Sequence, residues 1–440
     1  MKKVEINQIK ILKKLNGLIT KENNLDKNFS LKEYFYQITW ANNYGSWILK
    51  NFIIKNKFYF KNIISFFKFV LEFSIRDTNK FTFLGKVLKK NYKNLIITYS
   101  NNDKLKKKKL FDAPFNCKIE NTKNNLWVLI NFDQTNQSFN IQENVLIFQK
   151  KKNFFYLNYF FYFSLIKNFF IILFLKKKLV DNNLFCNFYS ILDKILEKNR
   201  ISRVIIAYES QPFQHAIIKF LKVKIKNLKI IGYLHSNLPS LPTDFVYKKK
   251  YEPDKLIVHG FEQKNILIKY LGWPSKKILV KKSFRYKKRN KSEFQNKIFL
   301  SYSIGNPSEV FFKMRIVFKN LSIDKNSYKI INHPYMGNSS RHLKLIDLIS
   351  SLIIKNSTKN QEKFTFVVGV SAIIPEILEN GQDVIQFCNE PLFEKHSEKI
   401  WKNIISKEIH EGVYHYKLKK FGSLINFGRD NVFKKFLASN

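Results

Sequence analysis

Two side chains that could move protons follow directly after short apolar runs. Glu209 comes after VIIAY, and His235 comes after KIIGYL. A carboxylate or an imidazole in such a place can act as a general base on a hydroxyl group, provided that its pKa suits the task. Glu209 could equally bind a sugar hydroxyl or pair with a lysine, and His235 is the rival base. Both are therefore candidate catalytic residues.

A histidine-proline pair, His333-Pro334, follows the apolar run YKIIN. Pro334 fixes its own φ and has no N–H group with which to extend a sheet, so the chain turns there. A histidine in such a turn can donate a hydrogen bond to a phosphate and stabilise charge on a leaving nucleotide. The alternative is a turn histidine without a chemical role.

Two segments place small residues just before an expected helix. Ser303 and Gly305 lie in SYSIG before PSEV, and Ser371 lies in GVS before IIPEILEN. The first backbone N–H groups of a helix have no partner within the helix and can bind phosphate. The alternative is ordinary N-capping by serine.

Short apolar runs predict the strands that would position these groups. Several of the runs are continuous rather than alternating, which is typical of parallel strands covered on both faces. Helical segments lie between many of them, which predicts a doubly wound α/β fold with ligands at the carboxyl ends of the strands. The expected strands are 95–99, 126–131, 145–148, 204–208, 229–234, 255–259, 298–302, 328–332, 364–370 and 383–387, and the expected helices are 214–222, 262–271, 308–319, 342–354 and 374–380.

Several of these segments resemble bacterial surface-carbohydrate glycosyltransferases of the GT-B fold. The resemblance covers residues 200–390 well, through VIIAYESQPFQHAIIKFL, IIGYLHSNLPSLPTDFVY, PDKLIVHGFEQKNILIKYLGWPSKKI and VVGVSAIIPEILENGQDVIQF, and residues 90–150 only by pattern. The pair in IINHP is similar to the nucleotide-binding motif of bacterial enzymes that use CMP-activated sugars, the sialyltransferases and Kdo transferases. Their motif of two acidic residues before a glycine has no clear match, since Tyr208-Glu209-Ser210 stands at the corresponding place.

The resemblance implies two Rossmann-like domains that face each other across a cleft. Residues 1–90 would be a mainly helical N-terminal region, 91–285 an acceptor domain and 294–440 a nucleotide-sugar domain, divided at the polar stretch 283–293. The implied reaction moves a sugar from a nucleotide-activated donor, CMP-linked sugars included, to a surface polysaccharide, lipopolysaccharide or lipid-linked glycan. Such enzymes generally need no metal or cofactor.

The same resemblance assigns roles to individual residues. His333 and Pro334 would lie at the nucleotide phosphate, and Ser371 would bind phosphate through its side chain and backbone. Glu379 would lie near the ribose. The nucleotide side would also include Ser303 and Gly305, whereas the acceptor side would present Glu209 and His235 together with Gln211, Ser236 and His259.

Composition narrows the classes of protein further. The chain has 440 residues, 45% hydrophobic and 16% aromatic, which is enough for two or three domains with large cores and excludes a disordered chain. The formal net charge is +45, but only eight of the 78 basic residues are arginines, the residue that phosphate and base recognition favours, so nucleic acid is not the expected partner. Three scattered cysteines predict a reducing compartment and no thiolate zinc site.

The most apolar stretch is 154–175, and 57–75 has a similar character. Asn158, Lys167 and Asn168 interrupt the first stretch, and its pieces are shorter than the roughly 20 residues of a membrane span. The interpretations are, in order of preference, a buried helix, an aromatic face resting on a membrane, and a transmembrane helix. The first 20 residues lack the apolar core of a secretory signal. We therefore expect a cytoplasmic protein at the inner face of an anionic membrane.

Two rival functions remain. A nucleotide-sugar epimerase could use the same fold, because fold does not determine function. A non-catalytic basic protein that binds nucleic acid or anionic membrane would explain the charge alone. Release of an isomer without any acceptor would favour the first rival, and salt-dependent binding to arbitrary DNA would favour the second.

Overall fold

The structure is a computed structural model that describes the chain from residue 2 to residue 439 with gaps. The predicted site residues Ser303 and Pro334, and the apolar stretch 57–75 except Leu71, lie outside the described residues. The described residues are 2–25, 71, 81–86, 88, 90–105, 110–120, 122, 124–134, 141–150, 159–170, 186–301, 304–321, 328–333, 340–351 and 364–439.

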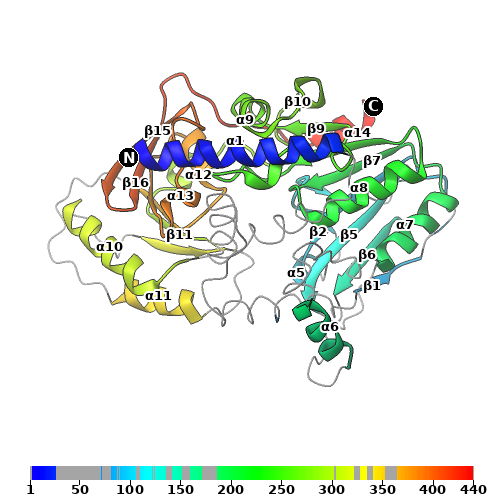
Figure 1. The fold of residues 1–440 in the computed structure, drawn as a ribbon, viewed down its shortest axis with the longest axis horizontal. Helices are drawn as coiled ribbons and strands as arrows, with labels where there is room; N and C mark the ends of the chain where they lie inside the picture. Colours follow the sequence, from blue (N-terminus) through cyan, green and yellow to red (C-terminus); the bar gives the residue numbers. More distant parts are fainter. Residues whose placement is uncertain are drawn as a thin grey trace.

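The first half of the chain builds an eight-stranded sheet (Figure 1). Its strands run in the order β1-β6-β5-β2-β7-β8-β9-β10, and every neighbouring pair is parallel except β1 with β6. The strands are β1 (Phe81–Leu84), β2 (Asn94–Ser100), β5 (Asn125–Gln134), β6 (Val145–Lys150), β7 (Arg203–Tyr208), β8 (Lys229–Leu234), β9 (Lys255–Val258) and β10 (Ile278–Val280).

Helices and a hairpin cover both faces of this sheet, which explains its continuous apolar strands. In β7, Val204 and Ile206 pack into one hydrophobic cluster and Ile205 into another, because neighbouring side chains point to opposite faces. The first face is covered by α7 (Cys186–Lys198), α8 (Pro212–Lys224) and α9 (Phe261–Leu271). The second is covered by α5 (Asn102–Leu105), the hairpin β3 (Phe111–Asp112) and β4 (Cys117–Lys118), and the C-terminal helix α14 (Val432–Ala438).

The second half builds a six-stranded sheet in the order β12-β11-β13-β14-β16-β15. The first four strands are parallel, and the β15–β16 hairpin adds two antiparallel strands. The elements are β11 (Lys297–Leu300), α10 (Pro307–Asn320), β12 (Lys329–Asn332), α11 (Ser340–Ser350), β13 (Thr365–Val368), α12 (Ile374–Glu379), β14 (Val384–Phe387), α13 (Pro391–Glu394), β15 (Ile404–His410) and β16 (Val413–Leu418), and short 3₁₀ turns lie at Thr243–Phe245, Ser275–Lys277 and Lys291–Glu293.

One hydrophobic cluster continues from the first half into the second. Tyr208 from β7 and Trp401, before β15, both belong to it and are fully buried. The Trp401 indole N–H donates to the Ser240 carbonyl oxygen at 3.1 Å, and the Asn237 amide donates to the Ala372 carbonyl oxygen at 2.8 Å. The contacts between the halves are therefore both apolar and specific.

The N-terminal helix α1 (Lys2–Leu25) lies across both halves (Figure 1). It packs against α9 in the first half and α13 in the second. The Gln8 amide donates to the carbonyl oxygens of Leu392 and Lys395, both at 3.0 Å, and Lys395 Nζ lies 3.1 Å from Glu5 Oε1. Helix α1 thereby links the two halves.

The C-terminal segment returns to the first half after β16. Gly428 pairs with Lys287, and a Cβ atom at Gly428 would lie 1.8 Å from the Ser283 carbonyl oxygen, so only glycine fits there. In α14, Phe433 stacks on Phe115 of the first half with ring centroids 4.2 Å apart. The helix that ends the chain thus belongs to the core of the other half.

Phe433→Ala should lower the free energy of unfolding by about 3–5 kcal/mol, because it removes a 1%-exposed ring from a cluster of aromatic side chains. Urea titration followed by fluorescence measures the loss. Phe421, 93% exposed, supplies the matched control, and Phe421→Ala should leave stability unchanged. Equal stability of the two variants would contradict the assigned role of α14.

The α/β class and all ten predicted strands are confirmed, and so are the five predicted helices. The strands β1, β3, β4, β10, β15 and β16 are additions, and β1 lies in the region 1–90 that we expected to be mainly helical. The GT-B arrangement itself stays a prediction.

Two segments singled out in the sequence are described by the structure, and the expectation for the second of them needs correction. The polar stretch 283–293 joins the two sheets, but it begins inside the protein, where Ser283, Phe284 and Tyr286 are buried. The preferred interpretation of 154–175 as a buried helix is wrong for its described part. Helix α6 (Tyr159–Phe170) instead exposes 69% of Phe163 and 59% of Ile166. No helix among the described residues is both long and apolar enough to cross a bilayer.

Candidate active site

The two rival bases of the sequence analysis form one hydrogen-bonded pair. Strands β7 and β8 are parallel neighbours in a register that pairs Tyr208 with Leu234. Glu209 and His235 are the next residues on each strand, so both leave the sheet at the same point of its carboxyl edge. Glu209 Oε1 lies 3.0 Å from His235 Nε2. The register of two adjacent strands therefore builds a carboxylate–imidazole pair.

The environment of Glu209 favours its ionised form. Burial by itself raises the pKa of this carboxyl group, but interactions with His235, Arg285 and Ser236 outweigh burial and hold the pKa below its ordinary value. Glu209 is therefore a carboxylate at neutral pH. The side chain of His235 is 7% exposed, and its ring lies 5.7 Å from that of Tyr99. The pair is thus desolvated, which strengthens its electrostatic interactions.

Arg285 is a site residue that the sequence analysis missed. Its guanidinium donates to the His235 carbonyl oxygen at 3.3 Å, and its charge acts on Glu209 in the first half and on Glu376 in the second. Its backbone N–H donates to the Tyr233 hydroxyl at 3.1 Å. Arg285 is nevertheless exposed to solvent. Arg285 therefore lies between the halves, with its guanidinium next to the carboxylate–imidazole pair.

The second half contributes His333, the residue that follows β12. It is half-buried, and its pKa lies below the ordinary value because of burial, of the nearby Arg285 charge and of His342. The charge of Arg285 thus acts both on Glu209 of the first half and on His333 of the second. A neutral imidazole there can donate a hydrogen bond without adding charge.

The two small-residue loops are built differently from each other. The backbone at Gly305 lies close to Asn389, and a Cβ atom at position 305 would be only 2.1 Å from the Asn389 side chain. The helix α10 that follows is capped by the Asn306 side chain, which accepts from the Ser308 N–H at 3.1 Å. Ser371 Oγ accepts from the Ile373 N–H at 3.4 Å. Local capping thus accounts for the contacts found here, and phosphate binding by these loops stays a prediction.

Glu379 has a structural contact in place of the expected position at a ribose. Its carboxylate accepts from the backbone N–H groups of Leu424 and Ile425 and from the Ser423 hydroxyl. It therefore anchors the returning C-terminal segment. Glu376, also on α12, lies 3.8 Å from Arg289 and interacts electrostatically with Arg285 as well, and burial raises its pKa. Helical spacing alone did not reveal which of the two glutamates interacts with Arg285.

The three residues expected on the acceptor side lie in different surroundings. Ser236 lies beside the pair and donates a hydrogen bond to Glu209. Gln211 stands at the N-cap of α8, and its backbone N–H donates to Gln214 Oε1 at 3.1 Å. His259 is wholly buried, 2.9 Å from Asn237 Oδ1, and so does not reach an acceptor in this structure. The expectation for His259 is corrected: it is a core residue.

Burial of His259 predicts acid-dependent stability. Desolvation lowers the pKa of its imidazole to about 3, whereas an unfolded histidine takes up a proton near pH 6.5. The unfolded state therefore binds more protons, and stability is lost as pH falls from about 6.5 toward 3, by about 1.4 kcal/mol per pH unit for this residue. The free energy of unfolding, measured by urea titration at pH 7.5, 6.0 and 5.0, should fall less steeply with decreasing pH for His259→Asn than for wild type. An equal dependence of stability on pH in the two proteins would contradict the assignment.

No cluster of three metal-ligating side chains occurs among the described residues. Neither a scan against protein-family models nor a search of curated proteins finds a match for this chain.

Proposed function

We propose that the protein is a glycosyltransferase that moves a sugar from a nucleotide-activated donor to a glycan acceptor. The observation that carries the proposal is the hydrogen-bonded pair of the Glu209 carboxylate and the His235 imidazole, together with Arg285 beside it. A carboxylate–imidazole pair can take a proton from a hydroxyl, and a guanidinium can bind the diphosphate or monophosphate of a leaving nucleotide.

The roles of the individual groups follow from their chemistry. Glu209 accepts the proton of the acceptor hydroxyl, while His235 and Ser236 hold its carboxylate in place. Arg285 and His333 stabilise the negative charge that develops on the departing phosphate. The remaining contacts of the nucleotide would come from the loops before α10 and α12. The acceptor would be a surface polysaccharide, a lipopolysaccharide or a lipid-linked glycan, as the sequence resemblance implies.

A screen for thermal stabilisation tests the proposal. The purified protein is heated with CMP, UDP, GDP and their sugars, with His333→Ala alongside. A ligand at 100 times its Kd stabilises the folded state by about 2.7 kcal/mol, which is a visible shift. Stabilisation of wild type by one nucleotide, and its loss in the variant, would support the proposal and identify the donor class. Stabilisation by DNA alone would contradict it.

A nucleotide-sugar epimerase is the second candidate, because the paired carboxylate and imidazole could remove a proton from a sugar carbon and return one. Incubation of the identified donor without any acceptor distinguishes the two. An isomer of the donor favours the epimerase, whereas an intact donor, consumed only when acceptor is added, favours the transferase.

The proposed location is the surface of an anionic membrane, where a lipid-linked acceptor would be found. Helix α6 exposes Tyr162, Phe163, Ile166 and Phe170, which lie within an arc of about 100° at 3.6 residues per turn. An aromatic face on a chain with net charge +45 suits a bilayer rich in anionic lipid. Phe163→Ser should weaken co-sedimentation with phosphatidylglycerol vesicles, and unchanged binding would contradict this location.

A further inference from the structure

The residue after Glu209 has a backbone conformation that needs support. Ser210 has φ of 58°, in the left-handed region that disfavours residues with a side chain. Its buried hydroxyl donates to the Asp244 carbonyl oxygen at 2.8 Å and accepts from Lys248 Nζ at 3.2 Å. Such a conformation persists only where the surroundings hold it. These two contacts, from a segment about 35 residues further along the chain, provide that hold.

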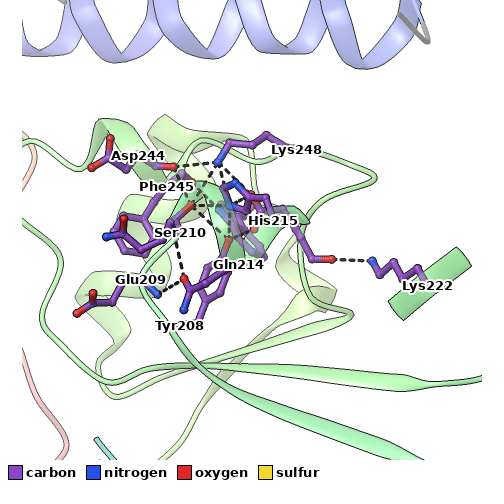
Figure 2. A network of polar contacts seen from close by, with 12 residues as sticks. Tyr208, Glu209, Ser210, Gln214, His215, Lys222, Asp244, Phe245 and Lys248 are labelled. Atoms are coloured by element: carbon purple, nitrogen blue, oxygen red, sulfur yellow. Dashed lines mark hydrogen bonds and ion pairs between the residues drawn. The ribbon is translucent and has the colours of Figure 1, made fainter. Parts of the chain in front are cut away.

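Lys248 and Glu252 form an ion pair with almost no exposure to water. Lys248 Nζ lies 3.3 Å from Glu252 Oε1, and the side chains are 1% and 0% exposed. The Tyr208 hydroxyl donates to the other carboxylate oxygen of Glu252 and lies 2.9 Å from His215 Nε2. Buried charges are tolerated only with such partners, because their removal from water is costly. We call these five residues the Lys248 network: Tyr208, Ser210, His215, Lys248 and Glu252 (Figure 2).

Glu209 lies between two members of this network, Tyr208 and Ser210. Its own N–H donates to Gln214 Oε1 at 2.9 Å, and Gln214 Nε2 donates to the Ala207 carbonyl oxygen at 2.7 Å. Figure 2 shows the Glu209 carboxylate pointing away from the network. The backbone of Glu209 is thus held on both sides while its side chain is left to face its imidazole partner.

We propose that the Lys248 network is a positioning device that holds Glu209 at hydrogen-bond distance from His235. The inference rests on the proposed role of Glu209 as the base. Its members do not touch the reacting atoms; they act through the left-handed backbone at Ser210. All five members of the network are buried, and the Glu209 carboxylate points away from them.

Two substitutions at Ser210 distinguish the effect of its backbone strain from the effect of losing its hydroxyl group. Ser210→Ala removes the hydroxyl and keeps the strain, so the loop should relax and Glu209 should move away from its partner. Ser210→Gly also removes the hydroxyl, but glycine adopts positive φ without strain. We expect a fall in kcat of about 10- to 100-fold for the alanine variant with an unchanged KM for the donor, and a near-normal kcat for the glycine variant.

A second pair of variants removes one charge from each of two buried ion pairs. Lys248→Met breaks the pair behind Glu209. Lys395→Met breaks the pair with Glu5 in the other half, where the lysine is also fully buried. Both should lower stability, but only Lys248→Met should alter the active site.

The direct readout is the imidazole NMR signal of His235, assigned by its disappearance in His235→Asn. It should shift at constant pH in Ser210→Ala and Lys248→Met, and stay in place in Ser210→Gly and Lys395→Met. An unshifted signal in Ser210→Ala, or equal shifts in the two serine variants, would overturn the inference. If Lys248→Met does not fold, the serine variants decide. Because this signal needs no substrate, absence of transferase activity in wild type would overturn the proposed function and leave this test intact.

Discussion

Glu209→Gln should lower the rate of sugar transfer by about two to four orders of magnitude, the usual contribution of a general base. Glutamine has nearly the same shape and can keep a hydrogen bond to His235, but it cannot accept a proton. The loss should therefore appear in kcat, with little change in the thermal stabilisation produced by the nucleotide. Steady-state rates with the donor identified by the thermal screen measure the effect.

Glu143→Gln is the matched control for this prediction. Glu143 pairs with Lys90 on the surface and is 60% exposed, so the substitution makes the same chemical change far from the pair. Its kcat should equal that of wild type. A Glu209→Gln enzyme that transfers sugar at the normal rate would remove Glu209 as the base. His235→Asn, tested in parallel, should also reduce kcat, because it removes the hydrogen-bond partner of the carboxylate.

Arg285→Gln should weaken nucleotide binding by about 10- to 150-fold, as expected for loss of a hydrogen bond between charged groups worth about 1.5–3 kcal/mol. The guanidinium lies beside Glu209 and within electrostatic reach of His333. A phosphate bound there would lose its charged partner. Calorimetric titration with the nucleotide measures the change in Kd.

Arg289→Gln provides the control for net charge. Arg289 is 53% exposed and 3.8 Å from Glu376, and the charge change is identical. Its nucleotide affinity should stay within about fivefold of wild type, since exposed ion pairs contribute about 0–1 kcal/mol. Equal weakening in the two variants would mean that the general positive charge, rather than Arg285, attracts the nucleotide.

The sequence was sufficient to predict most strands of the two sheets. All ten predicted strands occur within a few residues of their expected bounds, because a buried parallel strand needs a continuous apolar run, which is a local property. The same runs located Glu209 and His235 at strand ends. The short strand β10 and the amphipathic hairpin β15–β16 lacked that pattern and were missed.

The position of Arg285 at the candidate site was not apparent from the sequence, because the segment around it has the composition of a linker. SFRYKKRNKSE is polar and basic, yet Ser283, Phe284 and Tyr286 are buried where the chain passes from one sheet to the other. The composition of such a segment does not distinguish its buried residues from its exposed ones. Only the path of the chain in the folded protein places the charge of Arg285 at the site.

Which residues distant in sequence form hydrogen bonds or ion pairs with each other is determined by the tertiary structure alone. The sequence left Glu209 and His235 as rivals, and the register of β7 with β8 made them a pair. It placed Glu379 at a ribose, whereas the returning C-terminal segment takes that carboxylate as its anchor. Strand formation depends on neighbouring residues, but hydrogen bonds and charges act through space, so their partners follow from packing.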